Sequence, residues 1–291
     1  MEIKKAKRKE TPVLINLYGL SGSGKTYSAL RLAKGMLQGG GRIGLIDTEN
    51  GRASHYANDF DFDVIDLNPP FTPERFLEAV KTFENAGYKI VIIDSFSHEW
   101  EGSGGCVDIA ENKGSKGLAK WSDAKHRHKK MMNQLLYSKC HIIFCTRAKE
   151  LLEQVGREII NKGFFPIQEK NFPFEMLVTF YMKDQRPEVK KCPNDLKSLF
   201  QVDNDYLTET HGKAILQWSK QGEAIDELEK LKKTGANAAS DFGLDGLSDW
   251  WITLNKKQQS QLKEFKDKLK EQCGLSEKEN NSSKIDLEEL L

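Results

Sequence analysis

One eight-residue stretch near the start of the chain, residues 19–26, restricts the fold more than any other feature. It reads Gly-Leu-Ser-Gly-Ser-Gly-Lys-Thr and fits G-x-x-x-x-G-K-[ST], the phosphate loop of NTP-binding proteins. The apolar run 13–18 before it is typical of a buried strand, and residues 27–37 after it have helical apolar spacing. Backbone N–H groups in such a loop, together with the start of a helix, attract phosphate. The flanking elements disfavour the alternative of a plain Gly-rich turn.

The loop and the first helical residues are therefore the predicted nucleotide contacts. Lys25 is placed to reach the β- and γ-phosphates, and the Thr26 hydroxyl can bind Mg²⁺. ATP and Mg²⁺ are the expected cofactors. The predicted contacts are Gly19, Ser21, Gly22, Ser23, Gly24, Lys25, Thr26 and Tyr27.

Further strands and helices alternate along the chain, which predicts an α/β fold with a doubly wound, mostly parallel sheet flanked by helices. Strands are expected at 42–47, 62–67, 89–95 and 140–147, and helices at 72–87 and 118–137. Ligands of such sheets bind beyond the carboxyl ends of the strands. The chain places four polar or loop residues at these ends: Gly24, Glu49, Asp94 and Arg147.

Two acidic residues at strand ends have distinct expected roles. Asp94 closes the most apolar strand, where a carboxylate can hold Mg²⁺ through water, opposite Thr26. A hydrolase also needs a carboxylate that orients the attacking water. Ser95 follows Asp94, so the position often used for that carboxylate is empty, and Glu49 is the substitute. Glu99 is the alternative.

The 291 residues are enough for one large core with a small appendage. We expect a basic arm over 1–12, an ATPase core over 13–220, a helical region over 221–274 and a disordered acidic tail over 275–291. Residues 101–117 are predicted to form a loop, and residues 150–192 to add antiparallel strands at the sheet edge. In the helical region, Asn255 can cap a helix, with Gln258 three residues on.

Composition excludes some classes of protein. The net charge is +1, and no apolar run approaches the roughly 20 residues of a membrane helix. No signal-peptide pattern follows the basic start, so we expect no membrane association and a cytoplasmic location, that of the bacterial host if the chain is phage-encoded. The five cysteines form no CxxC pair, and no carboxylate or cysteine has zinc-like spacing to His98, His126 or His128. We therefore predict no zinc site.

Three segments resemble RecA-like recombinases. Residues 45–50, Leu-Ile-Asp-Thr-Glu-Asn, are similar to their strand that carries a catalytic Glu; residues 92–95 resemble their Asp strand; and residues 142–147 resemble their γ-phosphate-sensing strand, with Arg147 where Gln is common. With the helix of Trp121 and the run Thr-Arg-Ala-Lys, the order of motifs is similar to that of phage single-strand annealing recombinases, the Sak-four group.

The resemblance covers about residues 12–220 and implies a role for each matched residue. Glu49 would polarise the water, while Ser95 and Thr146 would hydrogen-bond around the γ-phosphate. Arg147 and Lys149 would bring positive charge, within the subunit or across an interface. It implies a slow Mg²⁺-dependent ATPase, stimulated by DNA or by oligomerisation, that forms a homo-oligomeric ring or filament on single-stranded DNA. A single-strand binding protein or another recombination protein is a further possible partner.

Seven Lys/Arg and one acid lie between residues 113 and 130, which suits contact with DNA phosphates. Lys113, Lys116 and Lys120 are the candidates, and a solvated helix face is the alternative. Phe164 and Phe165 can stack on bases, or else pack in a strand. A different function remains open, namely an ATP-gated switch or loader that acts on a partner protein in replication or repair through residues 223–291. A small-molecule kinase is disfavoured, because no Arg-rich lid is present.

Overall fold

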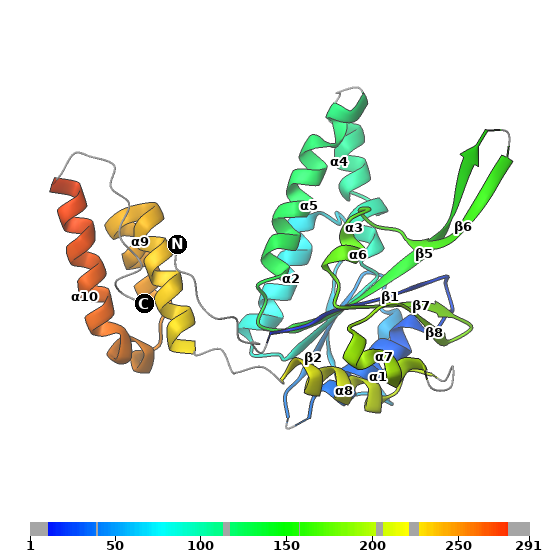
Figure 1. Ribbon diagram of the computed structural model, residues 1–291, viewed down its shortest axis with the longest axis horizontal. Coiled ribbons are helices and arrows are strands. Elements are labelled where there is room, and N and C mark those ends of the chain that lie inside the picture. Colours follow the sequence, from blue (N-terminus) through cyan, green and yellow to red (C-terminus); the bar gives the residue numbers. More distant parts are fainter. Residues whose placement is uncertain are drawn as a thin grey trace. The chain divides into compact units, whose positions relative to one another are not determined.

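The computed structural model describes residues 11–38, 40–112, 117–156, 158–201, 206–220 and 227–278 (Figure 1). The chain divides into two compact units. One comprises Pro12–Ser219, and the other comprises Lys220–Leu291 with Met1–Thr11. The basic arm, up to residue 10, lies outside the described residues, as does most of the predicted acidic tail.

The larger unit alternates strands and helices through its first half and adds strands and short helices afterwards. Its elements in chain order are β1 (Leu14–Gly19), α1 (Lys25–Met36), β2 (Ile43–Asp47), η1 (Arg52–Tyr56), β3 (Asp63–Asp66), α2 (Pro73–Asn85), β4 (Ile90–Asp94), α3 (Ser97–Glu101), α4 (Cys106–Asn112), η2 (Gly117–Lys120), α5 (Trp121–Leu135), β5 (His141–Val155), β6 (Glu158–Pro166), α6 (Phe172–Glu175), β7 (Val178–Lys183), β8 (Arg186–Lys191), α7 (Asn194–Gln201) and α8 (Glu209–Ser219).

The strands form one eight-stranded sheet in the order β3-β2-β4-β5-β1-β7-β8, with β6 paired to β5. Every pair from β3 to β7 along this order is parallel. The predicted α/β fold with a mostly parallel sheet is therefore confirmed. The later strands differ in part from the expectation: β6 and β8 are antiparallel additions, whereas β7 lies parallel to β1.

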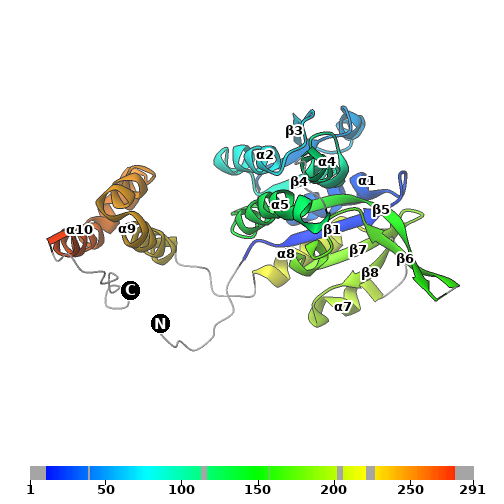
Figure 2. The same ribbon diagram turned by 90° about the horizontal axis from the view of Figure 1, so that it is seen from above.

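Apolar side chains alternate between the two faces of the sheet, and each face carries its own core. In β4, Ile90 and Ile92 pack with α1 and α8, whereas Val91 and Ile93 pack with α2 and α5. In Figure 1, α2 and α5 lie above the strands and α1 and α8 lie below them, and Figure 2 views the sheet from the α5 side. A strand that is apolar at every position is what a sheet covered on both faces requires. The carboxyl ends of the parallel strands are thereby held at one common edge.

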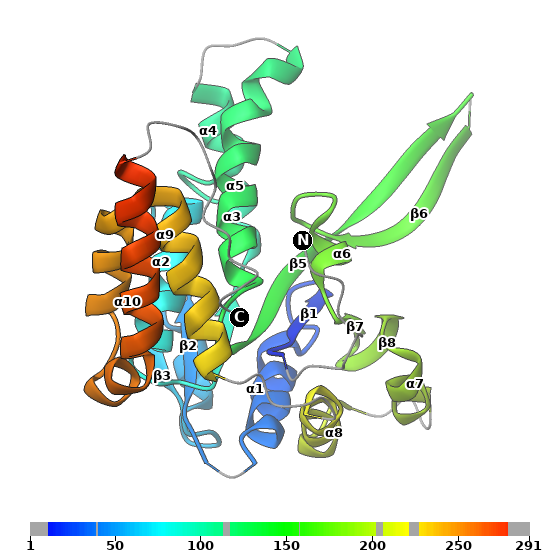
Figure 3. The ribbon, with the colours of Figure 1, turned by 60° about the vertical axis from the view of Figure 1, so that its left-hand side comes forward.

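Two features project from this core. β5 continues well past the sheet and returns as β6, and this hairpin extends away from the sheet in Figure 3. The second feature is α4. Residues 101–117 were predicted to form a loop, and this prediction is wrong in part, because α3 ends at Glu101 and α4 begins at Cys106. The glycines that suggested a long loop lie at 102, 104 and 105, and Cys106 and Ala110 beyond them are buried at helical spacing.

The smaller unit contains two long helices, α9 (Glu227–Ile252) and α10 (Lys256–Lys278), which pack side by side. α9 is kinked at Gly243, whose φ is 60°. The predicted cap is confirmed, since Asn255 and Gln258 exchange hydrogen bonds of 3.0 Å between side chain and backbone. α10 continues through Lys278, beyond the expected end at 274. No helix in the described part of the chain is long and apolar enough to cross a membrane.

This unit has a hydrophobic core of its own. The buried residues come from both helices and from the short link between them. They are Ala236, Ala239, Leu247, Trp250, Leu254, Leu262, Phe265, Leu269 and Cys273.

Candidate active site

The phosphate loop joins β1 to α1 and has the backbone shape that phosphate binding needs. Gly22 and Gly24 have φ values of 79° and 84°, in the left-handed region that favours glycine. Gly24 is the N-cap of α1, and it has no capping side chain, so the first N–H groups of the helix are directed at the loop. The Lys25 ammonium lies over the loop and donates to the carbonyls of Gly19 and Leu20, at 3.1 and 2.8 Å. The cradle is therefore formed by backbone and one cation.

The candidate metal ligands meet across the sheet edge. The Thr26 hydroxyl donates to Oδ2 of Asp94 at 2.5 Å, so the two oxygens expected to surround Mg²⁺ are already neighbours. Burial raises the pKa of Asp94 to about 6, although the Thr26 hydrogen bond and the Lys25 charge oppose the shift. The half-buried Thr26 hydroxyl and the buried Asp94 carboxylate are oxygen donors of the kind that Mg²⁺ prefers. The residues present therefore fit the ion. The peptide bond that follows Asp94 is cis.

A buried carboxylate fixes the turn that carries Glu49. Asp47, at the end of β2, accepts hydrogen bonds from the backbone N–H groups of Glu49 and Ala53, at 2.6 and 2.9 Å. Asn50 and Gly51, between them, both have positive φ, which folds the chain tightly round Asp47. Asp47 was not predicted as a site residue, although an acid just before a polar turn rich in Asn and Gly is a usable signal.

Glu49 is held by two arginines. Its Oε1 lies 2.7 Å from Nη2 of Arg147, and its Oε2 lies 3.3 Å from Nη1 of Arg52. Burial acts to raise the pKa of Glu49, but the hydrogen bond and charge of Arg147, with smaller contributions from Arg52 and His98, bring the net pKa below its usual value. Glu49 is therefore ionised at neutral pH, as a group that orients water must be.

The other residues expected near the γ-phosphate are placed differently. Ser95 is buried beside Asp94, and its hydroxyl has no hydrogen-bond partner among the described residues. Thr146 is also buried, but its hydroxyl donates to Asn16 at 3.0 Å, inside the sheet. Lys149 is exposed on the hairpin that leaves the sheet. None of Ser95, Thr146 and Lys149 lines the cavity at the phosphate loop.

That cavity has a volume of about 720 Å³ and brings together most of the predicted residues. Among the predicted contacts, Gly19 and Ser23 are not in its lining. Among the lining residues that sequence reasoning missed are Arg31, His55 and Gln185. Arg31 is bound to Glu209 at 2.6 Å, His55 comes from η1, and Gln185 comes from the β7–β8 turn against Gly24. The predicted residues that line it are Ser21, Gly22, Gly24, Lys25, Thr26, Tyr27, Glu49, Asp94 and Arg147.

Glu99, the alternative to Glu49, does not belong to this site. It is fully buried in α3 and contacts His128 and Cys106 rather than the cavity. Distance along the sequence from Asp94 was a poor guide, because α3 turns the Glu99 side chain toward α5.

The candidate nucleic-acid residues are scattered over the larger unit. Lys113 and Lys116 lie outside the described residues. Lys120 is half-buried, with its ammonium 5.6 Å from the centre of the Trp121 ring. Phe164 is stacked on Tyr181, with ring centres 5.6 Å apart.

Phe165 is 44% exposed and pairs with Lys149 across the β5–β6 hairpin. Of the two phenylalanines, Phe165 is the one whose ring faces solvent.

Comparison with known proteins gives a family. No curated protein matches the chain significantly. A family model described as an AAA domain matches residues 11–183, which is more than half of the chain and includes the phosphate loop, Glu49, Asp94 and Arg147. The chain therefore belongs to this AAA domain family, a family of P-loop ATPases.

Proposed function

We propose that the protein is a Mg²⁺-dependent ATPase of RecA-like type that acts on single-stranded DNA in phage-type homologous recombination or strand annealing. One cavity supports ATP hydrolysis best. It is lined by the phosphate loop, by the hydrogen-bonded pair of Thr26 and Asp94, and by Glu49. Glu49 stands at the end of β2, as the resemblance to RecA-like recombinases implies.

The chain's own residues divide the work of hydrolysis. The loop amides and Lys25 bind and orient the phosphates, and Thr26 and Asp94 supply the oxygen ligands for the ion. An ion held by these two residues would supply positive charge that neutralises the phosphates. Glu49 orients the attacking water and accepts its proton. Arg147 lies within reach of both Glu49 and the cavity, so it supplies positive charge where negative charge develops.

The DNA part of the proposal depends on the β5–β6 hairpin and on α5. Phe165 is paired with Lys149 across the hairpin and both are exposed, a combination of aromatic surface and cation that suits single strands. α5 adds exposed Lys125, Lys129 and Lys130. In this proposal a homo-oligomer, ring or filament, assembles on the strand when ATP is bound, with Lys149 near a neighbouring subunit's nucleotide.

Gel-shift and ATPase assays with and without single-stranded DNA test the proposal. We expect binding at low salt that requires ATP and weakens as salt rises, together with faster turnover. Phe165→Ala should weaken DNA binding and leave basal turnover unchanged, and Phe174→Ala, another exposed phenylalanine, is the matched control. Absence of DNA binding at low salt with ATP present would remove the DNA function.

A second candidate is an ATP-gated switch or loader that acts on a partner protein in DNA replication or repair. It is favoured by the separate hydrophobic core of the α9–α10 unit, which is a self-contained module suited to a partner. Truncation after Lys220 separates the two. If the truncated chain still binds DNA and hydrolyses ATP at the DNA-stimulated rate, the DNA function does not need this module. If truncation removes only a stimulation of ATP turnover by a partner protein, the result supports the switch or loader.

A further inference from the structure

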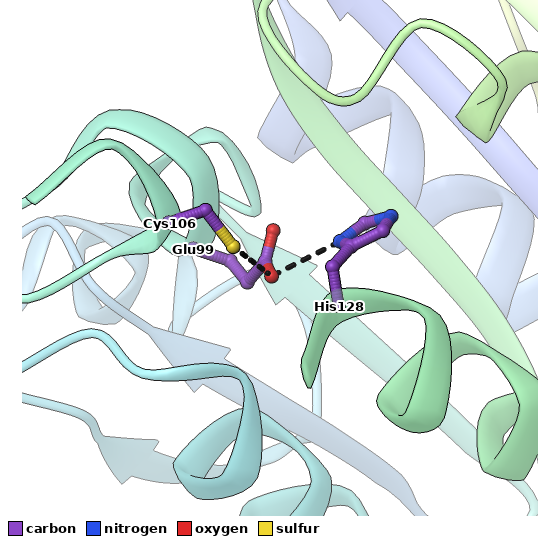
Figure 4. Close-up of side chains that lie close together, drawn as sticks. All are labelled: Glu99, Cys106 and His128. Carbon is purple, nitrogen blue, oxygen red and sulfur yellow. Dashed lines mark hydrogen bonds and ion pairs between the residues drawn. The ribbon is translucent and has the colours of Figure 1, made fainter. Parts of the chain in front are cut away.

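A second group of chemically reactive side chains lies apart from the nucleotide cavity, where α3, α4 and α5 meet. Glu99 comes from α3, Cys106 from α4 and His128 from α5 (Figure 4). Their potential ligand atoms all lie within 4.8 Å of one another. None of the three lines the cavity, so the mechanism proposed above leaves them without a role.

The contacts within this group leave one atom unused. Oε1 of Glu99 accepts a hydrogen bond from Cys106 Sγ at 3.2 Å and lies 3.0 Å from His128 Nδ1. Oε2 of the same carboxylate is buried and has no hydrogen-bond partner among the described residues. The side chains of Glu99 and Cys106 are fully buried, and His128 is 5% exposed. A buried carboxylate oxygen without a partner is costly, which points to a missing ligand.

We propose that Glu99, Cys106 and His128 bind a structural Zn²⁺ ion. Thiolate sulfur, imidazole nitrogen and carboxylate oxygen are the ligands that zinc takes. Oε2 of Glu99 has no other partner among the described residues, so this carboxylate can bind through both oxygens, and the three side chains then supply four ligand atoms. Zinc binding displaces the proton of the Cys106 thiol to solvent. One thiolate and one carboxylate then balance the double charge of the ion, so the buried centre is neutral. Ligand atoms that different side chains donate to one zinc ion lie about 3.5 Å apart, so only a small inward movement of the three side chains is needed.

The surroundings suit a structural ion rather than a catalytic one. The apolar core between these helices consists of Cys106, Ala110 and Ala124, with flanking aromatic rings. Such small side chains bury little apolar area, and small cores are commonly reinforced by a metal. Trp100 packs its edge against His128, with ring centres 5.8 Å apart, and its other neighbour is a stacked indole, Trp121. These rings shield the site from water.

Sequence spacing could not reveal this site. The prediction of no zinc depended on ligands close together along the chain, whereas these three come from three helices. What unites them is the packing of α3 and α4 on α5. α3 follows shortly after β4, which ends at Asp94. An ion bound here would therefore hold in place the segment that follows Asp94 at the edge of the sheet where the nucleotide cavity lies.

Metal binding to the full-length protein tests the proposal without measuring ATPase activity. The reduced protein is stripped with a chelator, saturated with Mg²⁺ and ADP to occupy the nucleotide cavity, and titrated with Zn²⁺ or Co²⁺. We expect one equivalent of Zn²⁺ to be retained after dialysis, and Co²⁺ to produce a thiolate charge-transfer absorption. Cys106→Ser should abolish this absorption and weaken Zn²⁺ binding more than tenfold. His128→Gln should also weaken Zn²⁺ binding more than tenfold.

Cys192→Ser is the control, because Cys192 is half-buried and lies outside the cluster; it should bind as wild type does. Wild-type protein that retains no Zn²⁺ and shows no thiolate absorption would overturn the proposal, whatever the variants do. Undiminished absorption in Cys106→Ser would overturn it as well. Where Cys106→Ser does not fold, the wild-type stoichiometry and absorption decide alone.

Discussion

Arg147, at the edge where β5 leaves the sheet, binds Glu49 in the turn just after β2, with Nη2 2.7 Å from Oε1. The two strands are not neighbours, because β4 lies between them. The ion pair thus spans the strand that ends in Asp94 and ties together the groups proposed to orient water and to stabilise charge. Arg147 must keep Glu49 ionised yet leave it able to reach the water beside the γ-phosphate.

Glu49→Gln should stop turnover while leaving nucleotide binding intact. The amide keeps the size of the side chain but cannot accept a proton, and general-base assistance is worth about 10²- to 10⁴-fold in rate. The measurements are single-turnover ATP hydrolysis and the affinity for a fluorescent ATP analogue. Normal hydrolysis in Glu49→Gln would show that Glu49 is not the base.

Arg147→Ala should lower turnover and move the acid limb of its pH profile to higher pH. The pKa of Glu49 is raised by burial and lowered by Arg147, so removing the arginine leaves burial less opposed, and the pKa rises. Because Glu49 works as a base only when ionised, activity is then lost at a higher pH as the solution is acidified. The pH dependence of kcat/KM measures this shift.

Arg52→Ala is the matched control for that shift. Arg52 also contacts Glu49, but its side chain is 68% exposed and the contact is longer, 3.3 Å. Solvent screens such a charge, so the acid limb should move little. Equal shifts in the two variants would mean that the ion pair with Arg147 does not set the pKa of Glu49.

Lys25→Ala should weaken ATP binding about 10- to 100-fold, the value of one or two charge-assisted hydrogen bonds. The fold should be unaffected, since the ammonium contacts only the carbonyls of its own loop. Lys34→Ala, on the exposed side of the same helix, is the control. Isothermal titration with ATP and Mg²⁺ decides the matter, and unchanged affinity in Lys25→Ala would contradict the assigned role.

Local pattern was sufficient for the strands and for the edge at which the site forms. The phosphate loop, Glu49, Asp94 and Arg147 each follow an apolar run, and parallel strands bring such ends together. Which side chains turn inward was not predictable in this way. Thr146 comes directly before Arg147, yet alternation along β5 directs its hydroxyl to Asn16 inside the sheet.

Contacts between distant segments escaped prediction for a different physical reason. Asp47 acts through backbone N–H groups, and Gln185 reaches the phosphate loop only because β7 lies parallel to β1. Glu99 was the alternative to Glu49 because it follows Asp94 closely in the sequence, but α3 turns its side chain toward His128 instead. Each of these depends on packing, which periodicity along the chain does not encode.

Gly212→Ala should destabilise the larger unit, because α1 and α8 meet at glycines. A Cβ at Gly212 would lie 2.1 Å from the Leu32 carbonyl oxygen, and one at Gly35 would lie 2.0 Å from the Glu209 carbonyl oxygen. Alanine favours a helix by about 1 kcal/mol over glycine. Overpacking costs about 1–3 kcal/mol, and a backbone atom cannot rotate away, so the clash should prevail.

Chemical denaturation followed by circular dichroism measures this effect on the free energy of unfolding. Lys213→Ala, at the exposed neighbouring position, should change it by less than about 0.5 kcal/mol. Combining Gly212→Ala with Gly35→Ala should cost less than the sum of the two, since the first substitution already separates the helices. A Gly212→Ala protein as stable as wild type would show that α1 and α8 can move apart freely, and the close glycine contact would then not hold them together.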